Sequence, residues 1–345
     1  LHHPGLAGRE KRQKPGGQGE VGQVVGPELH LESIDGRLAR RQGHDACIVD
    51  QDVDGASRRQ MALGEGDMSA GWTYGTLGAV SWFVGLIDDR TAQEVWGDDP
   101  NVLICSSTMP AGSATAADGG VRLSGHWRYA SGCVHAGWAV LGGFVNSAGA
   151  PPDYQFFVVP RQDYRTVDNW QVAGLQGTGS IDIILDDVFV PDECVVGEVD
   201  GGWRLARTTL ANERVAMGGS GLGKEMDALL GQIDSLGREL SAGELARLGD
   251  LVADAHVGRV LDALAVSRRL AGHDPGAVSS VRKLIGVAHR QSVPEFGLDL
   301  LGVDGAGAGE ASDQLLQNRC LSIAGGTTQI LRTAAAERIL GLPRG

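Results

Sequence analysis

The sequence lacks several features that would point to particular classes of protein. It has no long apolar run free of charges, which argues against a membrane span. Residues 1–12 are polar and basic and have no apolar core, so no signal peptide is expected. The net charge is -13, with 43 acidic residues against 30 Lys and Arg, whereas a nucleic-acid-binding protein needs a basic face. We therefore expect neither a membrane nor a nucleic acid as partner.

Cysteine is also scarce. The chain has five cysteines, an odd number, and none of them forms a CxxC pair. A disulfide framework or a zinc site would need paired or closely spaced cysteines, so neither is expected and no metal is predicted. Scattered free thiols favour a reducing, cytoplasmic setting. The five residues are Cys47, Cys105, Cys133, Cys194 and Cys320.

The 345 residues divide into four stretches of different character. Residues 1–60 are rich in Gly, Gln and Arg without sustained periodicity, a composition that favours disorder over a packed segment. Residues 61–100 read as helical, and the run "SAGWTYGTLGAVSWFVGLI" is apolar nearly all round, which predicts a buried helix. Residues 101–198 read as a β-domain and residues 199–345 as helical again.

The β-domain is predicted from alternation. In "VRLSGHWRYA" every second residue is apolar or small, which predicts a strand that places Val121, Leu123, Trp127 and Tyr129 on one face. "QFFVVP" and "SIDIILDDVFVP" are also strand-like and end at proline. Several short strands separated by glycine turns favour an antiparallel barrel or sandwich. The expected fold class is α+β: a short helical part, the β-domain and a helical bundle.

Apolar residues in the last stretch recur at helical spacing. One such set is Val281, Leu284, Ile285 and Ala288, whose spacing predicts a helix. Near the end, "IAGGTTQILRTAAAERILGLPR" places two glycines and two threonines before a helix that Gly341 ends. The free N–H groups of a helix N-terminus can bind a pyrophosphate, and glycines let it approach closely. From these residues alone, the turn at 325–328 is either such an anion site or an ordinary helix cap.

The C-terminal half resembles the acyl-CoA dehydrogenase superfamily. The resemblance is carried by "LDDVFVPDECVVG", "GWRLARTTLANERVAM", "SVRKLIGVAHRQSVPEFGLDLLGVDGAG" and the Gly-Thr turn before the last helix. In that superfamily the turn holds FAD. The resemblance therefore implies FAD as cofactor and flavin-binding roles for Gly326, Thr327, Gln329 and, near the ADP part, Gly302. It also implies an acyl-CoA dehydrogenase-like fold and an oligomer in which neighbouring chains share flavin sites.

The N-terminal half is similar to flavin-dependent aromatic hydroxylases, a branch of the same fold that uses reduced flavin from a partner reductase. The segments concerned are "VWGDDPNVLICSSTMPAGSA", "LSGHWRYASGCVHAGWAVLGGFV" and "WQVAGLQGTGS". The chain thus reads as a mosaic of the two branches. The resemblance implies that Ser107, Tyr129 and Ser131 contact the flavin ring. In the hydroxylase interpretation, Ser131 and His135 would serve catalysis.

The sequence also departs from the superfamily pattern. The superfamily's first helices are missing or replaced by residues 1–60, and the "Arg, then Phe-Gly" flavin motif is absent after "AVSRRLAG". The glutamate that often precedes the Gly-Thr turn is Gly325 here. Other members carry the base on the first C-terminal helix, at a position that matches Glu213, which is therefore the candidate base. No histidine follows His289, which counts against hydroxylation.

Three functions follow from these resemblances. The first is an FAD-dependent acyl-CoA dehydrogenase that acts on CH–CH groups, with Glu213 as base and an acyl-CoA substrate. Its electron acceptor would be a protein such as an electron-transfer flavoprotein. The second is a two-component flavin monooxygenase that hydroxylates a phenolic substrate. The third is a catalytically inactive flavin-binding subunit. A homo- or hetero-oligomer is expected in each case.

Overall fold

The structure is a computed structural model in two compact units. It describes residues 60–343 except 61, 65, 81–85, 147–150, 199–200, 208, 210–223, 272–277 and 308. Unit 1 contains the described residues up to 172 and from 176 to 207, and unit 2 contains Ala173–Leu175 and those from 209 onward. The stretch 1–59 and the candidate base Glu213 therefore lie outside the described residues. Each unit is considered by itself.

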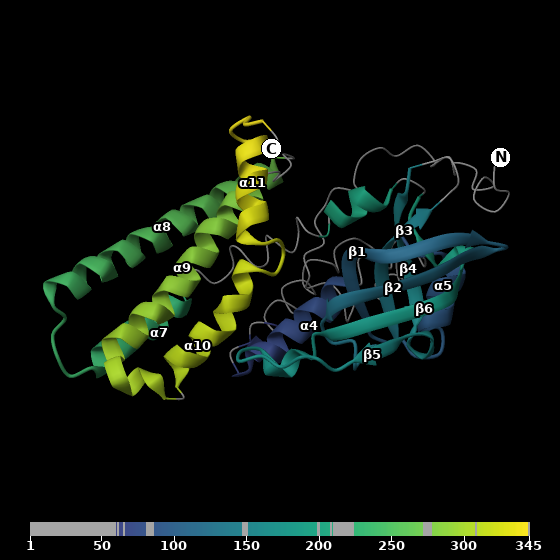
Figure 1. Cartoon of the computed structure of the whole chain (residues 1–345). Helices are drawn as coiled ribbons and strands as arrows, with labels where there is room; N and C mark the ends of the chain where they lie inside the picture. Colours follow the sequence, from purple (N-terminus) through teal and green to yellow (C-terminus); the bar gives the residue numbers. More distant parts are fainter. Residues whose placement is uncertain are drawn as a thin grey trace, which may run out of the picture. The chain divides into compact units, whose positions relative to one another are not determined.

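Unit 1 is built on one sheet of seven strands, drawn in blue to teal in Figure 1. The strand order across the sheet is β5-β6-β2-β1-β3-β4-β7. Every pair of neighbours is antiparallel except β1 and β3. The strands are β1 (Ile104–Ala117), β2 (Gly120–Ala130), β3 (Trp138–Asn146), β4 (Asp153–Pro160), β5 (Arg165–Val167), β6 (Ile181–Pro191) and β7 (Val195–Val196).

The parallel β1–β3 pair is the one departure from the expected antiparallel arrangement. A two-residue turn with Gly119 at φ 73° folds β2 back onto β1. The chain then crosses over, so that β3 pairs with the opposite edge of β1 and runs in the same direction. Alternation of apolar residues predicts the strands but does not reveal this order, because the alternating pattern is the same in parallel and antiparallel neighbours.

The core of unit 1 contains large aromatic side chains of the sheet. Trp127, Phe156 and Phe157 are fully buried, and Trp127 Nε1 donates to the carbonyl of Gly142 at 2.7 Å. The described helices of this unit include α4 (Met68–Val80), which contacts β1, and α5 (Asp89–Trp96), which contacts the short helix η5 (Asp192–Cys194). Residues 202–207 are helical as well. Among the described side chains of α4 only Ala70 is exposed; Leu77 and Val80 are buried, and Trp72 is half-buried. The rest of the predicted helix, 81–85, lies outside the described residues.

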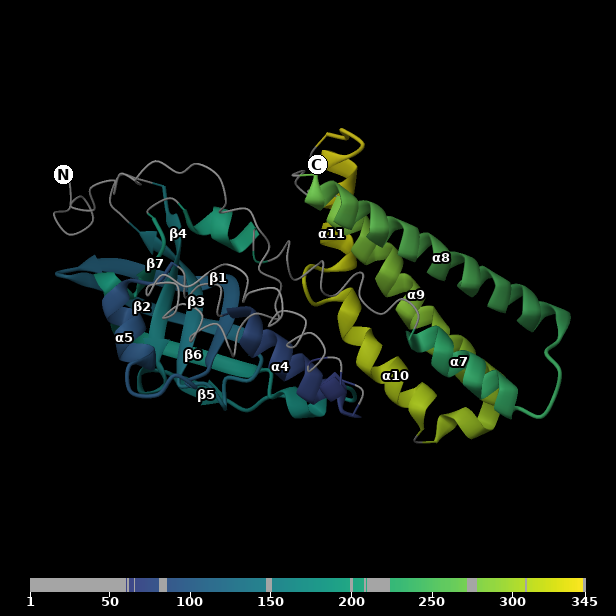
Figure 2. The same ribbon diagram turned by 180° about the vertical axis from the view of Figure 1, so that it is seen from behind.

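Unit 2 is a bundle of α-helices, shown in green and yellow in Figure 2. Between its helices lie two 3₁₀ segments, η6 (Gly302–Ala306) and η7 (Arg319–Ser322). Among the residues the structure describes, no helix combines the length and apolar character needed to cross a bilayer. The α-helices are α7 (Lys224–Ser235), α8 (Ala242–Leu270), α9 (Val278–Leu301), α10 (Glu310–Asn318) and α11 (Thr328–Arg338).

Helix α9 is central in unit 2 because it contacts α7, α8, α10 and α11. The helix predicted from the spacing of Val281, Leu284, Ile285 and Ala288 is confirmed, but these residues do not form its buried face. Ala288 is exposed and Val281 only half-buried, whereas Arg282, Lys283 and Val287 are buried. A helix enclosed on several sides buries polar as well as apolar positions, provided the polar groups find partners.

A proline inside α9 has a specific partner. Pro294 carries no N–H, so the carbonyl of Arg290 cannot receive the usual helical hydrogen bond. Asn318, at the end of α10, donates to that carbonyl through Nδ2 at 2.9 Å and is almost completely buried. Its own carbonyl accepts from Gln291 Nε2 at 2.8 Å. The junction of α10 and η7 is therefore fixed to the proline site of α9.

Candidate functional site

Tyr129 is turned away from the core by a β-bulge. The pairing of β2 with β6 shifts between Trp127 and Ala130, because β2 holds one residue more than its partner there. Tyr129 adopts φ 60°, which is unusual for a residue other than glycine, and it is 61% exposed. Simple alternation placed Tyr129 on the face of Trp127, and this is corrected. The bulge leaves the ring open to a ligand. The Trp170 ring is nearly perpendicular to it, with the two ring centroids 6.3 Å apart.

Ser131 belongs to a chain of hydroxyl groups at the turn after β2. The Ser131 Oγ is 2.7 Å from Ser180 Oγ and accepts a hydrogen bond from Trp72 Nε1 at 3.2 Å. Ser180 Oγ is in turn 2.8 Å from Thr178 Oγ1. The N–H of Gly132 donates to the carbonyl of Thr178, which closes the turn. A hydroxyl has one donor and two acceptor positions, and these two contacts use only two of the three. Ser131 therefore retains capacity for one further hydrogen bond.

Ser107 lies on β1, the strand next to β2, and is largely buried. The register of β1 with β3 breaks between Ser107 and Gly112, so this part of β1 is irregular. In the same irregular stretch the carbonyl of Thr108 accepts a 2.6 Å hydrogen bond from the Tyr154 hydroxyl. The structure thus places Ser107 and Tyr129 on adjacent strands, and Ser131 in the turn that follows Tyr129.

A cavity of about 470 Å³ adjoins this turn within unit 1. His135 forms part of its wall, together with residues of α4 that include Thr73 and Tyr74. Thr73 Oγ1 is buried and makes no hydrogen bond with any residue the structure describes. Ser131 and His135 share one turn, but only His135 lines the cavity. The lining residues are Leu63, Asp67, Ser69, Ala70, Thr73, Tyr74, Leu77, Leu103, His135 and Gly177.

Cys133, in the same turn, is not poised for nucleophilic chemistry. Its side chain is fully buried, and this burial raises the pKa of the thiol to about 11. A thiol with so high a pKa stays protonated near neutral pH, and the thiolate is the reactive form. The polar groups of this turn that can meet a ligand are therefore hydroxyls, the His135 ring and backbone groups.

The predicted anion site in unit 2 is the turn at residues 325–328. Gly325 and Gly326 have φ of 63° and 103°, conformations that favour glycine. Thr327 is the N-cap of α11, and its hydroxyl accepts from Ile330 N at 3.3 Å. The other N–H groups of the first helical turn have no partner within the helix. Together with the positive end of the helix dipole, they suit a phosphate oxygen.

Two other predicted residues of unit 2 lie differently. Gln329 is exposed in the first turn of α11, close to Thr327. Gly302 follows the C-terminal end of α9, whereas the 325–328 turn contacts Lys283 near the N-terminal end of that helix. The 19 positions between Lys283 and Gly302 span about 28 Å at the usual helical rise. Gly302 and Gly326 therefore do not meet at one phosphate group within a single chain.

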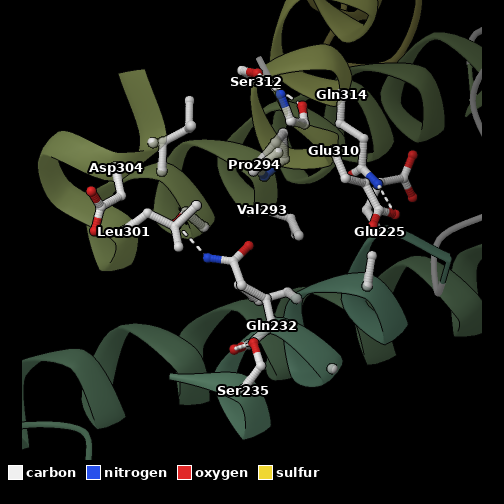
Figure 3. A pocket seen from close by; sticks show the side chains of 18 of the residues that line it. Glu225, Gln232, Ser235, Val293, Pro294, Leu301, Asp304, Glu310, Ser312 and Gln314 are labelled. Carbon is white, nitrogen blue, oxygen red and sulfur yellow. Dashed lines mark hydrogen bonds between the residues drawn. The ribbon is translucent and has the colours of Figure 1, made fainter. Parts of the chain in front are cut away.

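A cavity in unit 2 has a different character (Figure 3). It lies between α7, the second half of α9 and the start of α10, and none of the predicted site residues lines it. Three carboxylates line it, those of Glu225, Asp304 and Glu310, without a lysine or arginine. Glu225 is buried and paired with Arg290 Nε at 2.7 Å. Like charges repel, so this acidic lining is unsuited to a pyrophosphate.

Two polar arrangements were not foreseen from the sequence. In unit 1, the buried carboxylate of Asp182 lies 2.6 Å from His126 Nε2 and accepts from Asn169 Nδ2 at 3.0 Å. In unit 2, the buried Lys283 donates through Nζ to the carbonyls of Ala324 and Gly326, in the turn before α11. A lysine on a helix is usually exposed, so no sequence signal marks this one. Among the described residues, no cluster of three or more metal-ligating side chains occurs.

Comparison with known proteins supports the resemblances read from the sequence. Residues 200–340 match the family model described as acyl-CoA dehydrogenase, C-terminal domain. Acyl-CoA dehydrogenase FadE34 of Mycobacterium tuberculosis is 44% identical over 237 residues, which are 67% of this chain and 32% of that protein. The flavin-dependent monooxygenase oxygenase subunit HsaA of Rhodococcus jostii is 44% identical over 128 residues, 37% of this chain and 34% of HsaA. The matches span about a third of these relatives.

Solved structures confirm the fold class. An acyl-CoA dehydrogenase from Geobacillus kaustophilus superposes with a TM-score of 0.68 at 15% identity, covering 80% of this chain and 78% of that one. XiaF from Streptomyces, solved with FADH2 and glycerol, gives 0.67 at 20% identity with the same coverage. The α+β fold is thus that of the acyl-CoA dehydrogenases, and the resemblance to this superfamily is confirmed. The same relatives support FAD as the expected cofactor.

Proposed function

We propose that this chain is an FAD-dependent acyl-CoA dehydrogenase, which forms the α,β double bond of an acyl-CoA thioester. The observation that carries the proposal is the extent of the FadE34 similarity, which covers 67% of the chain, compared with 37% for HsaA. The match of residues 200–340 to the acyl-CoA dehydrogenase C-terminal domain agrees with it. The broader assignment, a flavin-dependent oxidoreductase, has the support of both groups of relatives.

The described residues fit a flavin cofactor. In unit 2, the turn at 325–328 offers backbone N–H donors and the positive end of α11 to a pyrophosphate. In unit 1, the exposed ring of Tyr129 offers an apolar surface for an isoalloxazine, and Ser131 keeps one free hydrogen-bonding position for its polar edge. When bound, FAD supplies the hydride acceptor, its N5 atom. The protein must then remove the α-proton.

Glu213 is the proposed base for that proton. The α-proton of a thioester is weakly acidic, so its removal needs a carboxylate in a desolvated site and hydrogen bonds to the thioester carbonyl. Glu213 lies outside the described residues, and its role rests on the match of "LANERV" to the superfamily. A buried carboxylate has a raised pKa and is correspondingly more basic.

The test compares product formation in three proteins. The wild type, Glu213→Gln and the control Glu239→Gln are reconstituted with FAD and supplied with acyl-CoA esters and an artificial electron acceptor. Glu239 is an exposed residue after α7 and has no part in the proposal. We expect enoyl-CoA from the wild type and the control, and at least a thousandfold lower rate from Glu213→Gln. Undiminished turnover by Glu213→Gln would exclude it as the base.

A second candidate function is a two-component flavin monooxygenase. It is favoured by His135, which lines the cavity beside α4, and by the similarity to HsaA. In this proposal a phenol would bind in that cavity, with its hydroxyl near the His135 ring. The test is to supply reduced flavin, oxygen and a panel of phenols and to measure hydroxylated product. His135→Ala should abolish any hydroxylation. If neither reaction occurs while flavin still binds, the chain would be the inactive flavin-binding subunit.

The partners are proposals of the same kind. A dehydrogenase would pass its electrons to an acceptor such as an electron-transfer flavoprotein. A homo- or hetero-oligomer is supported by the separation of Gly302 from the 325–328 turn, since two chains could bring these parts to one flavin. Sedimentation of the protein with and without FAD would show whether cofactor binding requires the oligomer.

A further inference from the structure

We propose that Lys283 is a positioning residue, which orients the turn before α11 so that its N–H groups face the pyrophosphate of FAD. This inference rests on the proposed flavin function and adds a residue to it. Lys283 is on α9, 41 positions before Ala324 and 43 before Gly326. It lies in the segment "SVRKLIGVAHRQ" that carries part of the resemblance, but no role follows for it from the sequence alone.

The burial of Lys283 is unusual. Only 1% of the residue is exposed, and it is among the largest fully buried side chains described. Its ammonium donates to the carbonyl of Gly326 at 2.7 Å and to that of Ala324. Removing an ammonium from water is unfavourable unless it gains compensating hydrogen bonds. Here two of these bonds go to the turn that holds the predicted anion site.

The two hydrogen bonds determine which way the peptide groups of the turn point. No cis peptide bond occurs in the described chain, and in a trans peptide the C=O and N–H point in opposite directions. The Gly326 carbonyl faces Lys283, so the N–H of Thr327 must point away from it. The positive φ angles of Gly325 and Gly326 allow this orientation. The Thr327 N–H thus joins the free N–H groups at the start of α11 as a donor.

Charge works in the same direction as geometry. The ammonium lies behind the carbonyls of the turn, so a phosphate on the N–H side would be separated from it by little more than the peptide groups. A positive charge in a buried position is weakly screened and favours an anion nearby. Lys283 should therefore strengthen the binding of any ligand that carries the pyrophosphate, whether or not the ligand has a flavin ring.

A purely structural role would have a different signature. Lys283 also ties α9 to the segment before α11, and its loss could simply destabilise unit 2. Arg282 provides a matched control, because it is the next residue, is also buried and is ion-paired with Asp262 on α8 instead of the turn. Replacing Arg282 should lower the stability of unit 2, because the Asp262 carboxylate loses its partner, but it should leave the turn at 325–328 unchanged.

The experiment compares three ligands on the full chain: FAD, ADP, which carries a pyrophosphate without the ring, and riboflavin, which carries the ring without phosphate. Dissociation constants are measured by calorimetry and flavin fluorescence for wild type, Lys283→Met and Arg282→Met. We expect Lys283→Met to weaken FAD and ADP at least tenfold and riboflavin less than twofold. Arg282→Met should change all three less than twofold.

Two results would overturn the role of Lys283. One is unchanged FAD and ADP affinity in Lys283→Met, and the other is an equal loss for all three ligands. If Lys283→Met does not fold, Lys283→Gln keeps a donor without the charge and should still weaken ADP at least tenfold, and wild-type affinity in that variant would contradict the proposal. A wild type that binds neither FAD nor ADP would instead refute the proposed flavin function.

Discussion

The interaction between Asn318 and the proline site of α9 makes a quantitative prediction. Replacing Asn318 by alanine removes its Nδ2 donor from the Arg290 carbonyl, to which Pro294 has no N–H to donate. A buried carbonyl left without a donor costs about 1–3 kcal/mol. The missing amide group also leaves a small cavity in a site that is 2% exposed. We therefore expect Asn318→Ala to lower the free energy of unfolding of unit 2 by about 2–3 kcal/mol.

The same reasoning predicts that the cost depends on the proline. In Pro294→Ala, the new N–H can donate to the Arg290 carbonyl through the normal helical bond. Asn318→Ala should then cost no more than about 1 kcal/mol, because the carbonyl keeps a partner. The two substitutions are thus coupled by about 1–2 kcal/mol. Ser322→Ala is the control, since the Ser322 hydroxyl donates to the Arg319 carbonyl at an exposed position of the same segment.

Urea unfolding followed by far-UV circular dichroism at 222 nm measures these effects, since the signal reports mainly the helices of unit 2. With a dependence on urea of about 2 kcal/mol per molar, Asn318→Ala should lower the midpoint by about 1 M. Ser322→Ala should move it by less than about 0.25 M. An equal loss from Asn318→Ala with and without Pro294 would refute the assigned hydrogen bond.

Two further predictions concern other residues. Tyr129→Gly should raise the free energy of unfolding by about 1 kcal/mol, because glycine adopts φ 60° without strain. The same variant should bind flavin more weakly, because the exposed ring is lost. Calorimetry measures both effects, and a destabilised variant would contradict the backbone strain assigned to Tyr129. Burial raises the pKa of Cys320 to about 11, above the usual thiol range, so its thiolate fraction at pH 8 is about 100-fold smaller than that of a free cysteine. Iodoacetamide, with peptide mapping, should label Cys320 more slowly than a free cysteine by that factor, and the rate should increase as the pH rises towards 11. Labelling of Cys320 at the rate of a free cysteine would contradict the burial of its thiol.

Much of unit 1 could be predicted from the sequence. Val121, Leu123 and Trp127 alternate as expected and are buried, because a strand that packs against a core repeats every second residue. The alternation fails at Tyr129, where one additional residue in β2 changes the face without changing the composition. A bulge is set by the partner strand, so the local sequence cannot reveal it.

Unit 2 was less predictable for a related reason. The spacing of Val281, Leu284, Ile285 and Ala288 correctly indicates a helix, but it does not show which residues of that helix are buried. Burial on α9 follows from its partners: Lys283 finds backbone carbonyls of the turn at 324–326. Such partners are distant in sequence, so hydrophobic periodicity contains no information about them.

The candidate site was predicted mainly from resemblance. The turn at 325–328 has the helix N-terminus, the N-cap and the positive φ angles that its sequence indicates. Its function as a pyrophosphate site remains a prediction, as do the roles of Ser107, Tyr129, Ser131 and Glu213. Residue types alone cannot separate a dehydrogenase from a hydroxylase here, because both chemistries use the same fold and cofactor and differ in a few side chains around the substrate.

The most direct test of the central claim is the visible absorption spectrum of the full chain with bound FAD, recorded anaerobically before and after a panel of acyl-CoA esters. The proposed dehydrogenase predicts that at least one ester bleaches the band of oxidised flavin near 450 nm within the time of mixing, since the substrate reduces the cofactor. A bound flavin that remains oxidised with every ester, in a protein that consumes a phenol once reduced flavin and oxygen are supplied, would contradict the dehydrogenase and establish the monooxygenase instead.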